Sequence, residues 1–554
     1  MTQSTNGKEA LGAAEIVRFL EDSGHRHVFG LPGSSMVAVL HQLQNSAIRY
    51  IPAIHESVTV AAADGYARVA GSAVALLYMV PGTANGLANL YNAWRDETSL
   101  IVLSSQQASH LRTKEGTVGE GDLVSMVEPF VRFSRELSRG MPVRRWLDRA
   151  RRAASGSPRG PAFLAIPEDV FEEPGPVPDE RETVRAEGGA PDLSLVVAHL
   201  RQATNPLLVV GGQVRRHGGA KWVERLAEDH GFAVAYEPGF NDQLSIAPGH
   251  PNLVGNLVRP GGAAAEAAAD VVLVVGARYI QEGHPRASEF FPTATFVGHV
   301  NADAAKLEET RVANWSCACD PGAFLRDLHA RLEAPSPRLL ERRRAGIAKA
   351  RAAALPDGAF ARALAAYDEA VRPLHDALDH GWVVDEAVMG SPAVVDALKG
   401  TDGRRYLAAS GGSLGWGTGA SVGVALASGE PVTCVLGDGA LRFGLHGLWT
   451  AAAEMLPITF VILDNGGYGS TRYFERAYVE RLGPAARPQR PSYLGMDLRI
   501  PQLGLPQLLG GFGIPSVTVP PGQDGRLELE RAWQSATQGP NAVILSLPFG
   551  AEVS

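Results

Sequence analysis

Cysteine is scarce in this chain, and its few copies are not arranged as a site. Cys317, Cys319 and Cys434 are the three cysteines among 554 residues. They make neither a disulfide framework nor a metal-ligand pattern, and we interpret Cys317 and Cys319 as incidental. The sequence therefore predicts no cysteine-based cofactor or metal centre.

Long apolar runs and long basic runs are also missing. No stretch reaches the roughly 18 consecutive apolar residues of a membrane span, and the N-terminus lacks a basic and apolar signal segment. A net charge of -8 without a basic block argues against a nucleic-acid partner. We therefore expect a cytoplasmic protein that binds neither membranes nor nucleic acid.

What is present is an ordinary globular composition on a long chain. Charged residues make up 20% and hydrophobic residues 45% of the sequence. The length is enough for roughly three to four domains, each with its own hydrophobic core. These values permit a multidomain enzyme without identifying one.

The most informative stretch reads as two strands that each end in an acidic turn, with a helix between them. Val432–Leu436 is a short apolar, partly β-branched run that ends at Gly437-Asp438-Gly439. A run with helical spacing follows to Met455, and Ile458–Leu463 is a second strand pattern before Asp464-Asn465-Gly466-Gly467. Parallel strands that flank one helix bring both turns to the same sheet edge, where ligands of such sheets bind.

Two properties of these turns suit a magnesium-bound diphosphate. The first turn of the helix points N–H groups and the positive end of its dipole towards Gly437-Asp438-Gly439, which favours phosphate. Asp438 and Asn465 offer the oxygen ligands that Mg²⁺ prefers, and phosphate oxygens and a backbone carbonyl would nearly complete its shell. The alternative is that both are ordinary turns of an α/β sheet, and a lone Gly-Asp-Gly would favour that alternative.

The spacing of the two turns resembles the signature of the thiamine-diphosphate enzymes. That signature is Gly-Asp-Gly, a helix and a strand, and then a pair of Asn residues. The resemblance implies that Asp438, the Asn465 side chain and the Gly467 carbonyl bind the metal. Asp464 departs from the pattern, because the first residue of the pair is usually Asn; we expect function to survive with a site that demands the cation more strongly. The resemblance also places four turn residues against the cofactor: Gly437, Gly439, Ala440 and Tyr468.

A second motif, near the N-terminus, carries a candidate acid. His55-Glu56 follows a strand pattern and opens the alanine-rich run Ser57–Gly71. A glutamate in this place could serve only the dipole of the following helix. Together with residues 29–35, Phe-Gly-Leu-Pro-Gly-Ser-Ser, it resembles the pyrimidine-binding domain of the same enzymes. The resemblance implies that Glu56 hydrogen-bonds the aminopyrimidine ring, which lets the cofactor lose its thiazolium C2 proton and become the nucleophile.

Other positions resemble the cofactor-binding loops of this family. Leu414, in the segment Ser410–Trp416, matches the bulky residue beneath the bent cofactor, and its alternative role is that of a loop hydrophobe. We expect a strand over Ala73–Tyr78, a turn over Val80–Asn85 and a helix over Gly86–Trp94. The cofactor contacts implied in these two regions are Gly82, Asn85, Gly412 and Ser413.

The position of Tyr78 bears on the reaction type. Benzoylformate decarboxylases of the family place a histidine in the strand where this chain has Tyr78, so the acid that returns a proton after decarboxylation is missing from that place. His284 lies near a position from which those enzymes send a histidine into the site, and it could supply the proton. His110 could do so as well, although surface exposure is the commoner state of such a residue.

The residues after the metal turn bear on the substrate. Ser470 and Thr471 stand where those relatives line the pocket with apolar side chains, and buried hydroxyls require a partner with hydrogen-bonding groups. The alternative is neutral variation at these positions. The remaining predicted pocket residues are Ser34, Gln107 and Phe474.

The middle of the chain has strand patterns without a dinucleotide fingerprint. Leu207–Val210 and Val271–Val275 are each followed by glycine, as Gly211-Gly212 and Gly276-Ala277. Neither gives the GxGxxG sequence that opens a helix in dinucleotide-binding folds. Acetolactate synthases of the family hold FAD in this domain, but this sequence shows no specific FAD feature and fold analogy does not supply one. We expect FAD to be absent, without excluding it.

These patterns together predict an α/β protein with three doubly wound parallel-sheet domains. An Ala- and Arg-rich helical run over 336–372 is interpreted as a solvated linker. The expected units are a pyrimidine-binding domain over 1–185, a central nucleotide-fold-like domain over 192–335, that linker, and a diphosphate-binding domain over 373–554. Because the two halves of each cofactor site come from different chains in this family, we expect a homodimer or homotetramer.

The resemblance predicts an enzyme that cleaves or forms a C–C bond next to a carbonyl with thiamine diphosphate and Mg²⁺. The favoured version decarboxylates a 2-oxo acid to an enamine and passes it to a carbonyl acceptor, as acetolactate synthases do. The alternatives are a simple decarboxylase of the benzoylformate type that releases an aldehyde, and a non-catalytic protein of the same fold. A dehydrogenase is disfavoured because its glycine fingerprint is missing. The sequence does not identify the donor or the acceptor.

Overall fold

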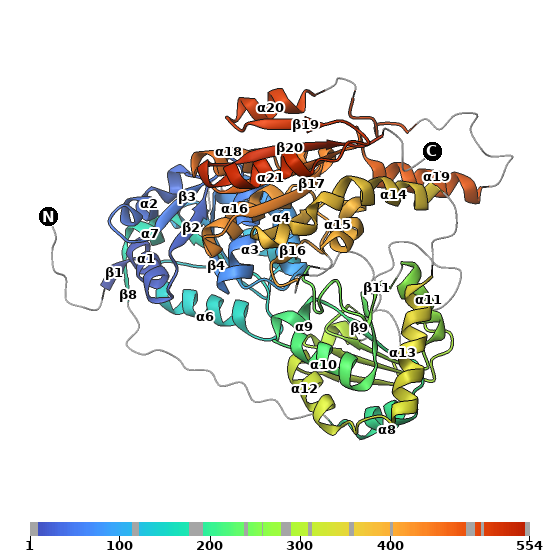
Figure 1. The fold of residues 1–554 in the computed structure, drawn as a ribbon. Helices are drawn as coiled ribbons and strands as arrows, with labels where there is room; N and C mark the ends of the chain where they lie inside the picture. The colour runs from blue at the N-terminus through green and yellow to red at the C-terminus, as the bar shows by residue number, and fades with distance from the viewer. Residues whose placement is uncertain are drawn as a thin grey trace.

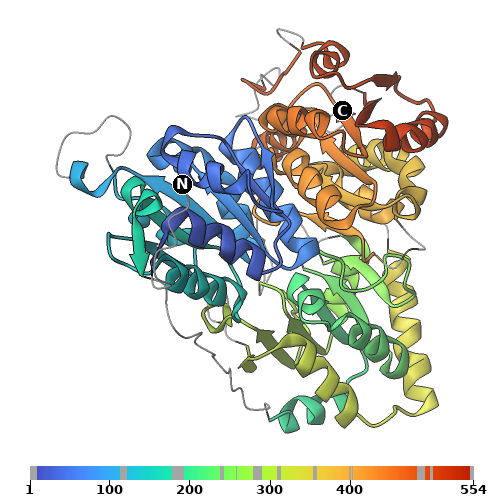
Figure 2. The ribbon, with the colours of Figure 1, turned by 90° about the vertical axis from the view of Figure 1, so that its left-hand side faces the viewer.

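The computed structural model describes most of residues 9–548 and places them in three α/β units. Figure 2 shows these units as a triangle, with the first in blue and teal, the central in green and yellow, and the third in orange and red. In the described part of the chain, no helix is both long enough and apolar enough to cross a membrane. The residues left undescribed are 1–8, 113–120, 177–191, 238–241, 258, 279–289, 308–312, 354–358, 399–400, 402, 483–492, 500–502 and 549–554.

The first unit is built on a parallel sheet of six strands in the order β3-β2-β4-β5-β7-β6. Its central strands are buried from end to end, which explains why they read as continuous apolar runs and not as alternating patterns. A short antiparallel pair, β1 (Glu9–Leu11) with β8 (Pro174–Pro176), stands apart from this sheet. The six strands are β2 (His27–Gly30), β3 (Arg49–Pro52), β4 (Ala73–Leu77), β5 (Leu100–Gln106), β6 (Phe133–Glu136) and β7 (Ala162–Pro167).

The third unit repeats this arrangement with the order β16-β15-β17-β18-β20-β19, again all parallel. In both sheets the chain starts at the second strand, moves to the neighbouring edge strand, and returns on the other side of the starting strand. The strands are β15 (Trp382–Glu386), β16 (Tyr406–Ala408), β17 (Val432–Gly437), β18 (Ile458–Asp464), β19 (Ser516–Val519) and β20 (Asn541–Ser546).

The central unit has a different strand order, β11-β10-β9-β12-β13-β14, and is also parallel throughout. Figure 1 shows it below the other two units. Its connections reverse direction between β9 and β12, which is the place where open α/β sheets bind ligands. Its strands are β9 (Pro206–Val210), β10 (Ala233–Tyr236), β11 (Leu253–Asn256), β12 (Val271–Val275), β13 (Phe296–Asn301) and β14 (Trp315–Ala318).

Two equivalent helices join the first and third units. Helix α3 (Glu56–Ala70) and helix α16 (Trp416–Ser428) each follow the edge strand beside the starting strand, and they pack against each other. A Cβ on Gly65 of α3 would lie 2.2 Å from the Ala420 carbonyl oxygen of α16. A Cβ on Gly423 would lie 1.9 Å from the Ala62 carbonyl oxygen, so the close approach depends on glycine on both sides.

Two local predictions were wrong. The expected turn at Val80–Asn85 is part of helix α4 (Met79–Arg95). Pro81 is tolerated there because backbone N–H groups of the first helical turn make no intrahelical hydrogen bond. The Gly82 N–H donates to the Tyr78 carbonyl oxygen at 2.8 Å. The expected continuous helix to Met455 is two helices, α17 (Asp438–Phe443) and α18 (Leu445–Ala453), separated by Gly444. Gly444 accepts a hydrogen bond from Thr418 at 2.7 Å, and a Cβ there would lie 2.5 Å from that hydroxyl.

The Arg-rich run is only partly solvated. It contains helix α13 (Pro337–Arg351), and Arg343 on this helix is 5% exposed. The Arg343 guanidinium donates to the carbonyl oxygens of Ala203, His230 and Leu200 at 2.6–3.1 Å. Arg343 therefore fastens α13 to the central unit by satisfying backbone acceptors at helix ends, a role that a count of surface arginines does not reveal.

Candidate active site

The first sheet reverses its connections between β2 and β4, and two residues predicted to be catalytic, Ser34 and Tyr78, meet there. Ser34 lies just after β2, and Tyr78 lies just after β4. Their hydroxyl oxygens are 3.4 Å apart, and Gly33 makes room for the Tyr78 ring, because a Cβ on Gly33 would lie 2.2 Å from it. Ser34 is exposed and Tyr78 is partly buried, so this pair of hydroxyls faces a region that a ligand can reach.

The candidate acid Glu56 sits at the start of α3, 7% exposed. The Asn85 amide donates to Glu56 Oε2 at 3.1 Å. Gly82 lies on the other side of the carboxyl, where a Cβ would be 2.9 Å from Glu56 Oε1. Three residues predicted to contact the cofactor, Glu56, Gly82 and Asn85, therefore form one group, and it was the helical course of α4 that brought Gly82 and Asn85 to the carboxyl.

Asp438 lies at the carboxyl end of β17 and is 1% exposed. Its carboxyl accepts backbone hydrogen bonds from Asn465 and Gly439, yet its Oδ2 atom has no hydrogen-bond partner among the described residues. Burial, and to a lesser extent the neighbouring Asp464, raise the pKa of Asp438 to about 7, while Arg442, 4.0 Å away, opposes the shift. A buried carboxylate oxygen without a partner is costly, and a bound cation would remove that cost.

The second turn lies beside Asp438 because β17 and β18 pair in parallel, with Gly437 opposite Leu463. Asn465 is 7% exposed, and its Oδ1 accepts from Gly467 N–H at 3.0 Å and from Arg472 at 3.4 Å. A cation bound through Oδ1 would take the place of the longer Arg472 contact. The Asn465 amide nitrogen donates to the Tyr367 hydroxyl at 2.8 Å, which fixes the orientation of the side chain.

These oxygen atoms fit a magnesium ion. The described residues contain no group of three or more His, Cys, Asp or Glu side chains that could hold a metal, so a cation here needs amide, backbone and ligand oxygens as well. That donor set is the one Mg²⁺ uses when it shares its shell with phosphate. A Cβ added to Gly439 would lie 3.1 Å from the Tyr468 ring, so glycine leaves space between the turn and this ring.

The predicted loop over Ser410–Trp416 borders a small cavity of about 40 Å³. Gly412, Ser413 and Leu414 line it, together with Glu386 from the end of β15. Both carboxyl oxygens of Glu386 accept backbone N–H groups at the start of α16, from Gly415, Trp416 and Gly417 at 2.7–3.1 Å. Burial raises the pKa of Glu386 to about 7, and these three hydrogen bonds oppose the shift. Glu386 therefore fixes the backbone immediately after Leu414.

The remaining predicted residues do not form one cluster. Gln107 is partly buried, and His110 is exposed on a short 3₁₀ turn. Ser470 is partly buried in the first turn of α19 (Gly469–Arg481), whereas Thr471 and Phe474 are exposed. His284 lies outside the described residues.

The carboxyl groups of Glu56 and Asp438 are not joined directly by a described polar contact. The described hydrogen bonds of the Glu56 carboxyl stay within the first unit, and those of the Asp438 carboxyl stay within the third. No hydrogen bond or ion pair among the described residues joins Glu56 to Asp438 or to Asn465.

The glycine turns of the central sheet do not fit a dinucleotide. A Cβ on Gly212 would lie 1.9 Å from Asp242 Oδ1, and one on Gly211 would lie 2.6 Å from Glu237 Oε1. Two carboxyl groups therefore stand where an anionic pyrophosphate would approach such a turn. Burial raises the pKa of Glu237 to about 7 and that of Asp242 above its usual range. The residues around Gly211 thus leave little space for a dinucleotide at this turn.

Sequence reasoning missed three residues that shape the site. Arg472 is 1% exposed and donates to the Asn465 carbonyl oxygen at 3.2 Å. Tyr367, from the expected linker, holds Asn465, and Glu386 holds the loop at Leu414. Arg472 comes two residues after the predicted pocket residue Ser470, and no local pattern indicates that its side chain is buried. A glutamate at the end of a buried strand, as at Glu386, was the one signal available.

Comparison with known proteins identifies the family of this chain. Three domain models of the thiamine pyrophosphate enzymes match: the N-terminal TPP binding domain at residues 11–126, the central domain at 193–328 and the C-terminal TPP binding domain at 390–545. Benzoylformate decarboxylase from Pseudomonas aeruginosa is 28% identical over 547 residues, which cover 96% of this chain and 97% of the relative. Acetolactate synthase isozyme 1 large subunit from Escherichia coli is 27% identical over 530 residues, or 93% of this chain and 90% of the relative.

A solved structure gives the same result at the level of the fold. The thiamine diphosphate-dependent 4-hydroxybenzoylformate decarboxylase of Rhodococcus jostii RHA1 superimposes with a TM-score of 0.82 at 25% identity, covering 98% of this chain and 99% of that chain. The predicted fold class of three parallel-sheet α/β domains is confirmed. The chain belongs to the thiamine pyrophosphate enzyme family.

Proposed function

We propose that this chain binds thiamine diphosphate through Mg²⁺ at Asp438, Asn465 and the Gly467 carbonyl. The observation that carries the proposal is the Asp438 Oδ2 atom, which is buried and has no hydrogen-bond partner among the described residues. It lies beside a second oxygen-bearing turn, at the sheet edge where ligands of parallel sheets bind. The first turn of α17 would hold the diphosphate oxygens through the N–H groups of Gly439 and Ala440.

Glu56 is the proposed acid for the other end of the cofactor. Thiamine diphosphate supplies a nucleophilic carbon and an electron sink, so the protein needs to bind, orient and move protons. Asn85 orients the Glu56 carboxyl through Oε2, and the absence of a side chain at Gly82 leaves space beside Oε1. The burial of Glu56 excludes water from the proton that it holds against the aminopyrimidine nitrogen.

In enzymes of this family the two halves of each cofactor site come from different chains, and this resemblance supports a shared site here. We propose that the first unit of one chain completes the third unit of its partner, in a homodimer or homotetramer with two-fold symmetry. Mixing inactive Glu56→Gln and Asp438→Ala chains tests this arrangement. Recovery of part of the activity in the mixture is expected, because one of the hybrid sites combines the intact halves.

We favour transfer to an acceptor over simple release of an aldehyde. Benzoylformate decarboxylase and acetolactate synthase relatives make both reaction types available to the family. In this chain the pair of hydroxyls at Ser34 and Tyr78, and the partly buried Ser470, offer hydrogen bonds to a polar acceptor. A proton donor of histidine type is absent from the Tyr78 position, which slows the protonation that aldehyde release requires.

Exchange at the cofactor tests the role of Glu56 without any substrate. Glu56→Gln should slow hydrogen–deuterium exchange at thiazolium C2 by at least about 100-fold, the usual range for a lost acid–base group, while cofactor affinity changes little. Glu21→Gln, at an exposed position of the same unit, is the matched control. Exchange at the wild-type rate in Glu56→Gln would remove Glu56 from the mechanism.

Product analysis separates the two reaction types. The enzyme would be incubated with pyruvate or benzoylformate, with and without aldehyde acceptors, and the products identified by mass spectrometry. Coupled products are expected only with an acceptor. Rapid release of free aldehyde without coupling would favour the simple decarboxylase, and no turnover of any 2-oxo acid would require another donor. Intact C2 exchange with no turnover of any donor would favour the non-catalytic alternative.

A further inference from the structure

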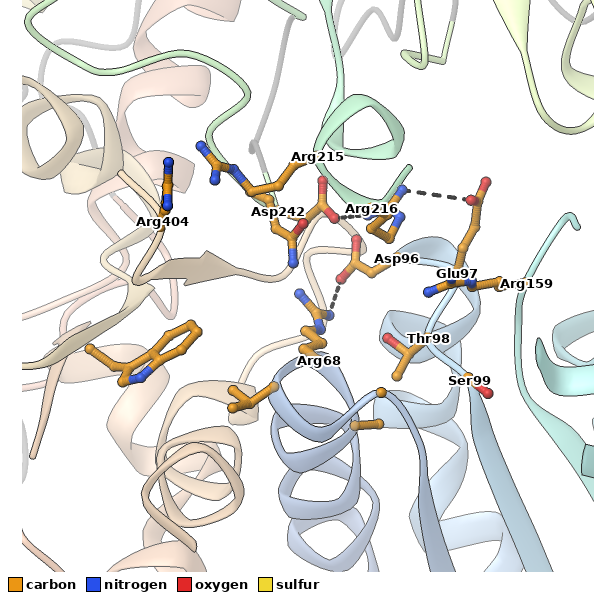
Figure 3. A pocket seen from close by; sticks show the side chains of 15 residues that line it. Arg68, Asp96, Glu97, Thr98, Ser99, Arg159, Arg215, Arg216, Asp242 and Arg404 are labelled. Atoms are coloured by element: carbon orange, nitrogen blue, oxygen red, sulfur yellow. Dashed lines mark hydrogen bonds and ion pairs between the residues drawn. The ribbon is translucent and has the colours of Figure 1, made fainter. Parts of the chain in front are cut away.

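A polar cavity of about 280 Å³ lies where the three units meet, away from the metal turn (Figure 3). The first unit contributes Arg68, Asp96, Glu97 and Arg159 to its lining. The central unit contributes Arg215, Arg216 and Asp242, and the third contributes Trp382 and Arg404. A ligand in this cavity would touch all three units at once.

The lining carries more positive than negative charge. It contains five arginines and three carboxylates. The carboxylates are directed towards two of the arginines: Asp96 pairs with Arg68, and Asp242 and Glu97 pair with Arg216. Figure 3 shows Arg215 and Arg404 together on one side of the cavity and Arg159 on the other, beyond Glu97. Arg215 of the central unit, which also donates to the Leu244 carbonyl oxygen, and Arg404 of the third unit can therefore approach one anion together, with Arg159 of the first unit across the cavity. Such an arrangement suits carboxylate or phosphate.

Hydrogen-bond donors in the lining also favour an anionic ligand. The Trp382 indole nitrogen and Arg216 Nε are buried atoms with no hydrogen-bond partner among the described residues. Both are donors only, so an acceptor-rich ligand satisfies them and a cation does not. The Gln243 amide oxygen is the buried acceptor of the lining without such a partner, and a ligand hydroxyl would satisfy it.

The wall of the cavity is joined directly to the predicted cofactor loop. The Asp96 carboxyl that binds Arg68 also accepts from the Ser410 backbone N–H at 3.1 Å and from the Ser410 hydroxyl. Arg68 itself donates to the Ala408 carbonyl oxygen at 2.6 Å. Two residues of the cavity wall thus fasten the chain at the beginning of the loop Ser410–Trp416.

The other end of the loop depends on the same network. Asp64, one turn before Arg68 on α3, accepts from the Trp416 indole N–H at 2.6 Å and from Arg68 at 2.9 Å. The Arg68 guanidinium also lies 4.8 Å from the centre of the Trp416 ring. Because α3 begins at Glu56, one helix joins the proposed cofactor acid to the cavity wall.

We propose that this cavity is an effector site for a small dianion, either a phosphate monoester or a short dicarboxylate, and that its occupation strengthens cofactor binding. The anion draws the guanidinium groups of the three units together and so stabilises the arrangement in which Arg68 and Asp96 hold the loop. The second part rests on the proposed function, since it concerns the loop that carries Leu414. The first part, binding of the dianion, does not depend on the cofactor.

Calorimetric titration of the full-length, cofactor-free protein tests the binding. The probes are inorganic phosphate, glycerol phosphate and succinate, with glycerol as the uncharged control. Arg404→Gln should weaken binding at least about tenfold, the loss expected for one charge-assisted contact. Arg405→Gln is the matched control, because Arg405 is the exposed neighbour that pairs with Glu430 at 3.2 Å outside the cavity; it should bind as the wild type does.

The pattern of binding identifies the source of the anion. Binding of the phosphates alone assigns the site to a phosphate monoester, and binding of succinate alone assigns it to a dicarboxylate. No binding of any probe at millimolar concentration, or equal weakening in Arg404→Gln and Arg405→Gln, overturns the proposal.

Cofactor titration tests the coupling separately. Saturation with the bound probe should tighten thiamine diphosphate binding at least about fivefold in the wild type and leave it unchanged in Arg404→Gln. Anion binding without this change would retain the site but overturn its regulatory role. Failure of the protein to bind thiamine diphosphate under any condition would instead refute the proposed function, while the calorimetric result would stand.

Discussion

The central and third units each have a glycine turn at the carboxyl edge of their own parallel sheet, but different side chains surround the two turns. In the central unit, Asp242 and Glu237 occupy the space beside Gly211-Gly212, and Arg216 pairs with Asp242. In the third unit, the Asp438 carboxyl stands in the turn itself with one oxygen that no described residue satisfies. Side chains therefore fill the turn of the central unit, whereas the turn of the third unit needs a cation.

The difference shows that a backbone suited to phosphate does not make a phosphate site. Both turns follow a buried strand and lead into a helix, as anion-binding turns do. The side chains that reach each turn decide the outcome. Asp242, paired with Arg216, and Glu237 fill the turn of the central unit, whereas Asp438 leaves one oxygen without a hydrogen bond in the turn of the third unit. The following four variants act on one turn or the other, in order of decreasing expected effect.

Removing the carboxyl of Asp438 should have the largest effect. Asp438→Ala takes away the one carboxylate proposed to bind the metal, so the magnesium-dependent affinity for thiamine diphosphate should fall at least about 100-fold. Titration of the cofactor against intrinsic fluorescence measures this loss. Asp524→Ala, at an exposed position that caps Arg526, is the control and should bind normally. Unchanged affinity in Asp438→Ala would place the metal elsewhere.

Opening the central turn should cost stability and not cofactor affinity. Arg216→Gln leaves Asp242 and Glu97 buried without their cation, which should lower the free energy of unfolding by about 3–5 kcal/mol. Urea denaturation followed by circular dichroism measures the loss. Arg225→Gln removes only an exposed pair with Asp229 and should change stability by less than about 1 kcal/mol. A similar small effect in Arg216→Gln would mean that the cluster is solvated.

The pH dependence of stability should report the closed turn as well. The pKa of Glu237 is about 7, above its unfolded value of 4.5, because burial favours the protonated form. The folded state therefore binds the proton more tightly, and this stabilisation is complete below the unfolded pKa and is lost as the pH rises through the folded pKa. Between about pH 5 and about pH 8 the wild type should lose about 1–3 kcal/mol more than Glu237→Gln does. Equal losses in urea denaturation would show that Glu237 is ionised throughout.

The smallest effect is expected at Asp464. Asp464→Asn restores the usual Asn pair without removing a proposed ligand, so the magnesium concentration for half-maximal activity should change less than about threefold. Asn465→Ala should raise that concentration at least about tenfold, because it removes a ligand. Equal losses at both positions would show that the ligand has been assigned to the wrong residue of the pair.

The sequence was sufficient for the sheets and for the order of the motifs. Strands such as Val271–Val275 are buried on both faces, so their apolar runs were readable without knowledge of their neighbours. Element ends were less certain where two signals compete: Pro81 and Gly82 read as a turn, yet Pro81 falls in the first turn of α4, where it is tolerated.

The long-range parts of the site could not be read in this way. Arg472 and Tyr367 act on Asn465 from 7 and 98 residues away, and neither has a local pattern that indicates this contact. The network of Arg68, Asp64 and Asp96 joins the first unit to the Ser410–Trp416 loop, which lies more than 300 residues later in the chain. Motif spacing does not predict contacts over such a distance. Periodicity reports which face of an element is buried, but not which residue meets it.

The contact between α3 and α16 has a further consequence, which concerns symmetry. Gly65 of α3 meets the Ala420 carbonyl of α16, and Gly423 of α16 meets the Ala62 carbonyl of α3. In each helix the glycine follows the contacted alanine by three residues, so the two sides exchange the same contact. Such reciprocity is the mark of an isologous interface between identical subunits. Here both partners belong to one polypeptide, so each half is free to differ, and one carries Glu56 where the other carries the Leu414 loop.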